Sequence, residues 1–173
     1  NLISKLYTNY EGEILINGYE INDYKDEDLR NKVLFLESKP FILRDKLTSN
    51  ITLLEKNKVD ELYLEKITQF LELEKIEKYS TKNLKDTLSK GEQQKVQLAR
   101  MMIGRYSLIL LDEVLSGLDQ EMKKKVISKI KEKSKNKIIV IVSHDNEIQR
   151  GCNEIILMPD KNTLIKNKNI HKS

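Results

Sequence analysis

The stretch from Leu88 to Asp119 constrains this chain more than any other, because it carries three phosphate-chemistry signals in a fixed order. The first is Ser89 followed by Glu92 three residues later, a capping box that predicts the start of a helix. The amino end of a helix carries free backbone N–H groups and attracts anions. Gly91 lacks a Cβ, so a ligand can approach this backbone closely. The segment therefore predicts a helix end that binds an anion.

The second signal is an apolar run, Leu108 to Leu111, which predicts a buried parallel strand. Asp112 and Glu113 follow it, at the carboxyl end where open α/β sheets bind their ligands. We interpret Asp112 as a metal ligand and Glu113 as a base. A capping box alone often marks only a helix start, and an acidic pair after a strand is often a solvated loop. Their combination at this spacing favours phosphate chemistry.

Three motifs in this stretch resemble those of ATP-binding-cassette (ABC) ATPases. Leu88 to Glu92 resembles the signature motif, whose usual form is Leu-Ser-Gly-Gly-Gln. Leu108 to Glu113 is similar to the Walker B strand, and Ser116 to Asp119, the third signal, is similar to the D-loop. The resemblance covers nearly the whole chain. It implies an α/β fold of the P-loop NTPase type: a mostly parallel sheet flanked by helices, with a small antiparallel β part and an α-helical subdomain.

Composition agrees with one globular domain that has a real core. The 173 residues are 39% hydrophobic and 34% charged, with a net charge of +4 and mixed signs along most of the chain, so we expect no nucleic-acid partner. The single cysteine, Cys152, cannot form an internal disulfide and suits a reducing cytoplasm. No apolar stretch approaches the roughly 20 residues of a membrane helix, and no signal peptide is visible. Membrane association would come from a partner, at the cytoplasmic face of the cell membrane.

The sequence contains no match to Walker A, the phosphate-binding loop of this family. It needs Gly-x-x-x-x-Gly-Lys-Ser/Thr, and none of the six glycines precedes a lysine. Residues 1–7 resemble the helix that follows this loop in ABC domains. We therefore expect residues 1–173 to be a single ABC domain truncated immediately after its Walker A loop. The alternative is a natural start without the loop.

The rest of the chain alternates predicted strands and helices. Asn17-Gly18 supplies the positive φ angles of a tight hairpin turn. Apolar spacing and capping residues predict helices at residues 26–32, 59–70, 94–102 and 120–133, a helix start at 48–51, and buried strands at 33–36 and 137–142. We also expect a closing hairpin within 154–165 and a frayed basic tail at 166–173. The resemblance places a helical subdomain that touches a transmembrane partner at about residues 42–100.

Ser38 occupies a position that is usually a glutamine in this family, two residues before Pro40. The family glutamine reaches the magnesium ion and the attacking water. A serine hydroxyl can still ligate magnesium but is shorter, and neighbouring Glu37 could reach in instead. A plain loop that joins a strand to a helix is the remaining alternative.

His144 follows the predicted strand at residues 137–142. A lone histidine is usually structural or merely exposed. After a Walker B match, His144 resembles the switch histidine of the family, which contacts the terminal phosphate. The signature itself departs from the usual form, since Lys90 replaces the first glycine and Glu92 replaces the glutamine. Neither change removes the helix-end N–H groups or the Ser89 hydroxyl, and Lys90 is either a phosphate contact or a surface lysine.

The resemblance implies a composite site for ATP and Mg²⁺, shared with a second ABC ATPase domain in a homodimer or heterodimer. Asp112 would hold magnesium, Glu113 would deprotonate the attacking water and His144 would contact the terminal phosphate. The family positions that bind ATP correspond to Ser89, Lys90, Gly91, Glu92 and Asp119, and Asp119 would also link the paired sites. Without the phosphate loop, the chain alone is expected to be inactive.

Transport is the favoured interpretation, because the segment from Phe41 to Ile51 resembles exporter domains. One alternative is a non-hydrolysing partner cassette that lends only its signature. Another is a soluble ABC-type ATPase of DNA maintenance, whose signatures often end in Gly-Glu as Gly91-Glu92 does, or of translation. The compact run from Gly12 to Leu88 leaves no room for the long coiled coil of the DNA-maintenance group. The sequence does not identify the substrate, the direction of transport, or whether a membrane domain is fused.

Overall fold

A three-stranded parallel sheet forms the centre of the fold. A computed structural model describes residues 2, 3, 5, 7, 9–53, 59–77 and 84–158. The strands are β3 (Val33–Leu36), β4 (Leu108–Asp112) and β5 (Ile138–Val142), in the order β3-β4-β5. Leu36 pairs with Leu111, and Asp112 pairs with Val142. All three strands therefore end at the same edge of the sheet.

A small antiparallel hairpin precedes this sheet. It consists of β1 (Leu15–Ile16) and β2 (Tyr19–Glu20). The turn residues Asn17 and Gly18 have φ angles of 52° and 82°, the left-handed values that such a tight turn requires. The predicted hairpin is confirmed, and with the parallel sheet and its helices it confirms the predicted α/β fold class.

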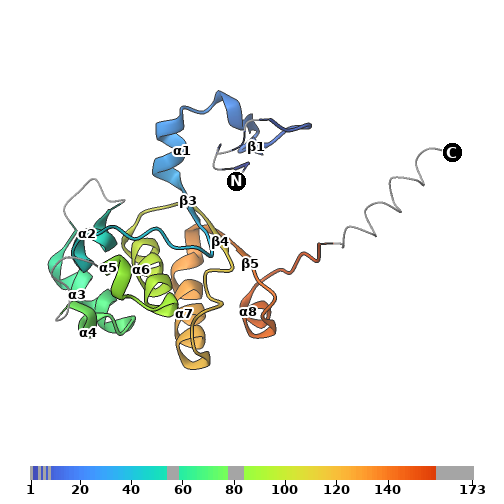
Figure 1. The fold of residues 1–173 in the computed structure, drawn as a ribbon. Helices are drawn as coiled ribbons and strands as arrows, with labels where there is room; N and C mark the ends of the chain where they lie inside the picture. The colour runs from blue at the N-terminus through green and yellow to red at the C-terminus, as the bar shows by residue number, and fades with distance from the viewer. Residues whose placement is uncertain are drawn as a thin grey trace.

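Helices pack against the sheet and extend to one side of it. They and the 3₁₀ turns are η1 (Ile21–Asp23), α1 (Asp26–Lys32), α2 (Leu47–Thr52), α3 (Glu61–Phe70), α4 (Glu74–Glu77), α5 (Leu84–Thr87), α6 (Lys90–Ile103), α7 (Gln120–Lys133), η2 (Ser134–Asn136) and α8 (Asn146–Gly151). Figure 1 shows α2 to α5 gathered on the side of α6 away from the strands, with α7 beside α6 and α8 beyond β5. Within the described ranges, no helix has both the length and the apolar character needed to cross a membrane.

The hydrophobic core lies where α6 and α7 meet the central strand. Val96 and Leu98 of α6, Leu111 of β4, and Met122 and Val126 of α7 are all at most 1% exposed. Burying a side chain of this size stabilises the fold by about 1.5–3 kcal/mol. The core therefore holds the amino end of α6 and the carboxyl end of β4 on one rigid body.

Two expectations about the carboxyl-terminal part are wrong. Strand β5 is not fully buried, because Ile138 and Val142 are 67% and 55% exposed and none of the described elements packs on that face. Residues 154–158 form no strand and are exposed, so the first half of the expected hairpin is absent there. The other half of the expected hairpin, at 159–165, and the basic tail at 166–173 lie outside the described residues.

A buried arginine ties α6 to the loop that follows β3. Arg100 is 4% exposed and Asn50 of α2 is fully buried. The Arg100 Nε donates to the Asn50 carbonyl and its Nη1 donates to the Phe41 carbonyl, both at 2.7 Å. The Asn50 side-chain amide donates to the carbonyls of Leu43, Asp45 and Lys46. Burial lowers the pKa of Arg100 to about 10, so the guanidinium stays charged at neutral pH.

A second polar contact joins α7 to the start of α8. The Lys123 Nζ lies 2.7 Å from the Asp145 Oδ2, and the side chains are 9% and 23% exposed. The Asp145 Oδ1 accepts a hydrogen bond from the Glu147 N–H at 2.9 Å. The hydrogen bond from Lys123 and then the backbone N–H of Glu147 lower the pKa of Asp145 below its ordinary value.

Replacing Arg100 with methionine should lower the free energy of unfolding by about 3 kcal/mol, because the buried Asn50 carbonyl and the partly buried Phe41 carbonyl lose their donor. Urea denaturation of the intact protein, followed by a probe in this domain, measures the change. The matched control is Arg105→Met, since Arg105 is exposed, and it should change the free energy by less than about 0.5 kcal/mol. Equal effects of the two variants would contradict the role of Arg100.

Asp145→Asn should remove an acid-dependent part of the stability. Because the pKa of Asp145 is lowered in the folded state, its contribution is complete above its ordinary pKa of 3.8 and is lost as the pH falls through the lower folded value. The stability gap between wild type and Asp145→Asn should therefore be largest at neutral pH and close in acid. Thermal unfolding between about pH 7 and pH 3 tests this, with the exposed Asp86→Asn as control. A gap that does not depend on pH would refute it.

Candidate functional site

The amino end of α6 forms the capping box that the sequence predicts. The Ser89 Oγ accepts a hydrogen bond from the Glu92 N–H at 3.3 Å. The Glu92 Oε2 accepts from the Ser89 N–H at 2.8 Å and from the Ser89 hydroxyl at 2.7 Å. Ser89 and Lys90 are exposed. The backbone N–H groups of Lys90 and Gly91, in the first turn, have no carbonyl partner within the helix and are the donors left for an anion.

Gly91 packs against the backbone of Gly117, in the loop after β4. A Cβ at Gly91 would lie 2.9 Å from the Gly117 carbonyl oxygen. The sequence predicts that the missing side chain lets a ligand come close to the backbone at Gly91. The structure adds a packing reason for the missing side chain, because any larger residue would push α6 away from the loop after β4.

The acidic pair stands at the carboxyl end of β4. Asp112 is the last residue of the strand, and its carboxylate makes no hydrogen bond or ion pair within the described part of the chain. Glu113 has a φ of 52°, which is uncommon for a residue other than glycine and costs about 1 kcal/mol or more. Its N–H donates to the Val142 carbonyl at 3.0 Å. This contact with β5 holds the strained turn in place.

Glu113 and His144 lie side by side, as expected for residues that follow adjacent parallel strands. The Glu113 Oε1 accepts a hydrogen bond from the backbone N–H of His144 at 3.2 Å. The His144 Nε2 is 3.9 Å from the same oxygen. The imidazole is fully exposed, whereas the Glu113 side chain is 28% exposed. The pair therefore presents a carboxylate and an exposed imidazole to the same surface.

Two further predicted residues, Ser38 and Asp119, lie in different settings. Ser38 lies in an exposed loop two residues after β3, whose last residue pairs with Leu111, and its hydroxyl bonds to none of the described residues. Asp119 is the N-cap of α7 and accepts a hydrogen bond from the Met122 N–H at 2.8 Å, which lowers the pKa of Asp119. Its carboxylate is thus already used in capping a helix.

The oxygen ligands at this edge suit Mg²⁺ only if phosphate and water oxygens complete its coordination shell. Among the described residues, no three histidine, cysteine or acidic side chains gather as a metal site. Mg²⁺ in phosphate-transfer sites is commonly held by one or two carboxylates and completes its shell with water and phosphate oxygens. The unpaired Asp112 carboxylate meets that requirement.

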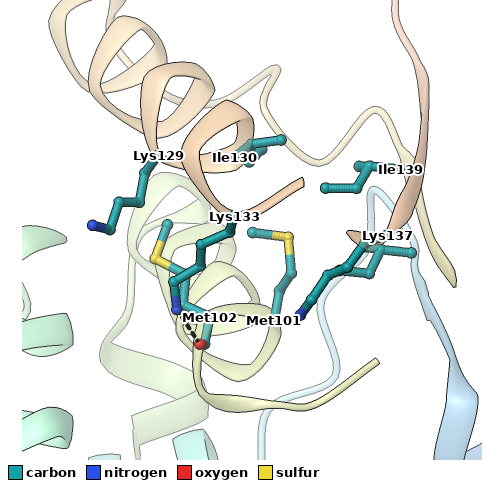
Figure 2. A pocket seen from close by; sticks show the side chains of 8 residues that line it. Met101, Met102, Lys129, Ile130, Lys133, Lys137 and Ile139 are labelled. Atoms are coloured by element: carbon teal, nitrogen blue, oxygen red, sulfur yellow. Dashed lines mark hydrogen bonds between the residues drawn. The ribbon is translucent and has the colours of Figure 1, made fainter. Parts of the chain in front are cut away.

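A pocket at the opposite edge of the sheet offers no such chemistry. Figure 2 shows its lining of Met101 and Met102 from α6, Lys129, Ile130 and Lys133 from α7, and Lys137 and Ile139, with Ile109 also contributing. Ile109 and Ile139 belong to the amino-terminal halves of β4 and β5. The Lys133 Nζ donates to the Met102 carbonyl at 2.8 Å and to the Tyr63 hydroxyl. Lys133 of α7 is therefore hydrogen-bonded to both α6 and α3.

Sequence comparison connects the chain with transport proteins. The family model described as ABC transporter matches residues 1–116. The glutathione/L-cysteine transport system ATP-binding/permease protein CydC of Haemophilus influenzae is 32% identical over 83% of this chain and 27% of that protein. The ATP-dependent lipid A-core flippase of Photobacterium profundum is 25% identical over 92% of this chain and 28% of that protein. The chain thus spans little more than a quarter of the length of these relatives.

Comparison of structures supports the same fold. A bacterial Atm1-family ABC exporter with ATP bound matches with a TM-score of 0.76, over 85% of this chain and 27% of that chain, at 21% sequence identity. The family model covers more than half of the 173 residues, including the helix end at Ser89 and the pair Asp112 and Glu113. On these grounds the chain belongs to the ABC transporter family, as one of its ATP-binding domains.

Proposed function

We propose that this chain is the ATP-binding and ATP-hydrolysing domain of an exporter-type ABC transporter. The observation that carries the proposal is the placing of Glu113 and His144 together at the edge where β4 and β5 end. Two relatives, named as a flippase and as a transport system, favour transport as the process that ATP hydrolysis drives.

Glu113 is the general base of the proposed reaction. Its Oε1 is held by the His144 N–H, which leaves Oε2 to accept a proton from the attacking water. The water oxygen then bonds to the terminal phosphorus, the bond to the ADP oxygen breaks, and the proton stays on Glu113. The strained φ of Glu113 turns the chain sharply after β4.

His144 and Asp112 manage charge on either side of this base. The exposed imidazole of His144 can donate a hydrogen bond to the terminal phosphate. Asp112 would hold Mg²⁺, through water, with Ser38 as a further ligand. The ion, when bound, would neutralise charge on the phosphate oxygens.

The remaining parts of the site lie across an interface with a second ATP-binding domain. The exposed helix end with Ser89, Lys90 and Gly91 would contact the nucleotide of that domain, with Glu92 orienting the Ser89 hydroxyl. Asp119 would face the partner near the same interface. We place residues 42–100 towards a transmembrane domain, which would keep this domain at the cytoplasmic face of the membrane.

A second candidate function is that of a partner cassette that does not hydrolyse ATP. The 173 residues contain no Gly-x-x-x-x-Gly-Lys-Ser/Thr, the phosphate cradle that hydrolysis requires. A non-hydrolysing partner cassette would need only the helix end at Ser89. Mass analysis and peptide mapping of the native protein separate the two: a Walker A sequence in the same polypeptide supports hydrolysis, and its absence supports the partner cassette.

Glu113→Gln in the intact protein should lower ATP hydrolysis at least about a hundredfold while ATP still binds, because the amide cannot take the proton. Phosphate release and nucleotide binding measure the two effects separately. Glu13→Gln is the control, since Glu13 is exposed and distant in sequence, and it should hydrolyse ATP at the wild-type rate. Turnover retained in Glu113→Gln would remove Glu113 as the base.

His144→Ala should lower the hydrolysis rate more than ATP binding, because the imidazole acts on the terminal phosphate. The backbone N–H that holds Glu113 remains in this variant, so the base stays in place. His144→Gln, which keeps a side-chain donor, should restore part of the rate. If binding and hydrolysis fall by the same factor, His144 is a structural residue instead.

A further inference from the structure

A buried glutamine on α6 contacts only the loop after β4 through its side-chain hydrogen bonds. Gln94 is fully buried. Its Oε1 accepts from the Gly117 N–H at 2.8 Å, and its Nε2 lies 3.5 Å from the Ser116 Oγ. A buried amide whose partner is lost costs about 1–3 kcal/mol, so both ends of this side chain favour one position of the loop.

The spacing between α6 and this loop is set on both sides by glycine. A Cβ at Gly91 would lie 2.9 Å from the Gly117 carbonyl oxygen, and a Cβ at Gly117 would lie 2.6 Å from the Gln94 Oε1. Neither glycine has a positive φ angle, so close packing explains their lack of a side chain better than backbone freedom does. The loop is therefore seated on the first turns of α6 with no space to move closer.

The contact continues from the loop to Glu113. The Ser116 Oγ donates to the Glu113 carbonyl at 2.9 Å, and the Ser116 N–H approaches the same oxygen at 3.3 Å. Glu113 has the strained φ of 52°, a conformation that persists only where surrounding contacts hold it. Two consecutive contacts, Gln94 to Ser116 and Ser116 to Glu113, thus connect Gln94 to the backbone of Glu113.

We propose that Gln94 is a positioning residue that locks Glu113 to the amino end of α6 within one chain. The inference rests on the proposed function, because it takes Glu113 as the base and the Ser89 helix end as the contact to a second nucleotide. Through Gln94 and Ser116, a shift of the helix end moves the loop and with it Glu113. Nucleotide bound at the partner's site would in this way set the position of the base at this domain's own site.

The simpler role for Gln94 is to fill space in the core, and Gln97 offers a matched control for it. Gln97 lies one turn further along α6, is 4% exposed, and its Oε1 has no hydrogen-bond partner among the described residues. Gln94→Met and Gln97→Met make the same chemical change on the same helix. Only the first removes bonds to the loop.

The test is a double-mutant cycle in the intact protein, read by single-turnover ATP hydrolysis and by ATP binding. Gln94→Met should slow hydrolysis about tenfold or more with ATP affinity unchanged, whereas Gln97→Met should stay within about twofold. Combined with Glu113→Gln, Gln94→Met should cause no further loss, because it acts through a base that is already disabled.

The outcomes distinguish a failure of the positioning role of Gln94 from a failure of Glu113 as the base. Equal effects of Gln94→Met and Gln97→Met, or losses that multiply in the combined variant, overturn the positioning role and leave the base assignment intact. Full turnover in Glu113→Gln alone overturns the base assignment and the positioning role with it. If Gln94→Met does not fold, Ser116→Ala decides by the same criteria, since Ser116 is exposed and its hydroxyl is the link to Glu113.

Discussion

The parallel pairing of β4 with strands on both sides is the constraint on which the rest of the structure depends. Its register places Leu111 opposite Leu36 and Asp112 opposite Val142. Because parallel strands run in the same direction, the residues that follow them come to one edge of the sheet. Strand pairing thus brings segments that are far apart in sequence, near Ser38, Glu113 and His144, to that edge.

Helix α6 connects the loops after β3 and β4 to the helical part of the fold. Its amino-terminal part is joined to the loop after β4 through Gln94, and its carboxyl-terminal part is joined to the loop after β3 through Arg100. Both side chains are buried and hydrogen-bonded. Since polar groups in a low-dielectric interior are costly when unpaired, such contacts favour a single relative position of the helix and the two loops. The same helix presents Ser89 to the exterior.

Local features were predictable because their signals lie within a few residues. Asn17-Gly18 indicates its own turn, and Ser89 with Glu92 marks the start of α6. The placing of Asp112 and Glu113 followed from a general rule about strand ends. The sequence did not reveal the roles of Gln94 and Arg100, because they contact groups 23 and 59 residues away. Polar residues at core-facing positions of a helix were the only available signal.

The amino-acid sequence by itself determined the class of fold, the order of the elements, and the family to which the motifs pointed. These properties depend on apolar spacing, capping residues and short motifs, all of which are local. Only the tertiary structure decided that the His144 backbone holds Glu113, that Gly91 is packed against Gly117, and that one face of β5 is exposed in the described fold. The physical reason is that hydrogen-bond partners and burial are set by strand register and helix packing. These join segments that are far apart in the sequence and contain no local signal of their contact.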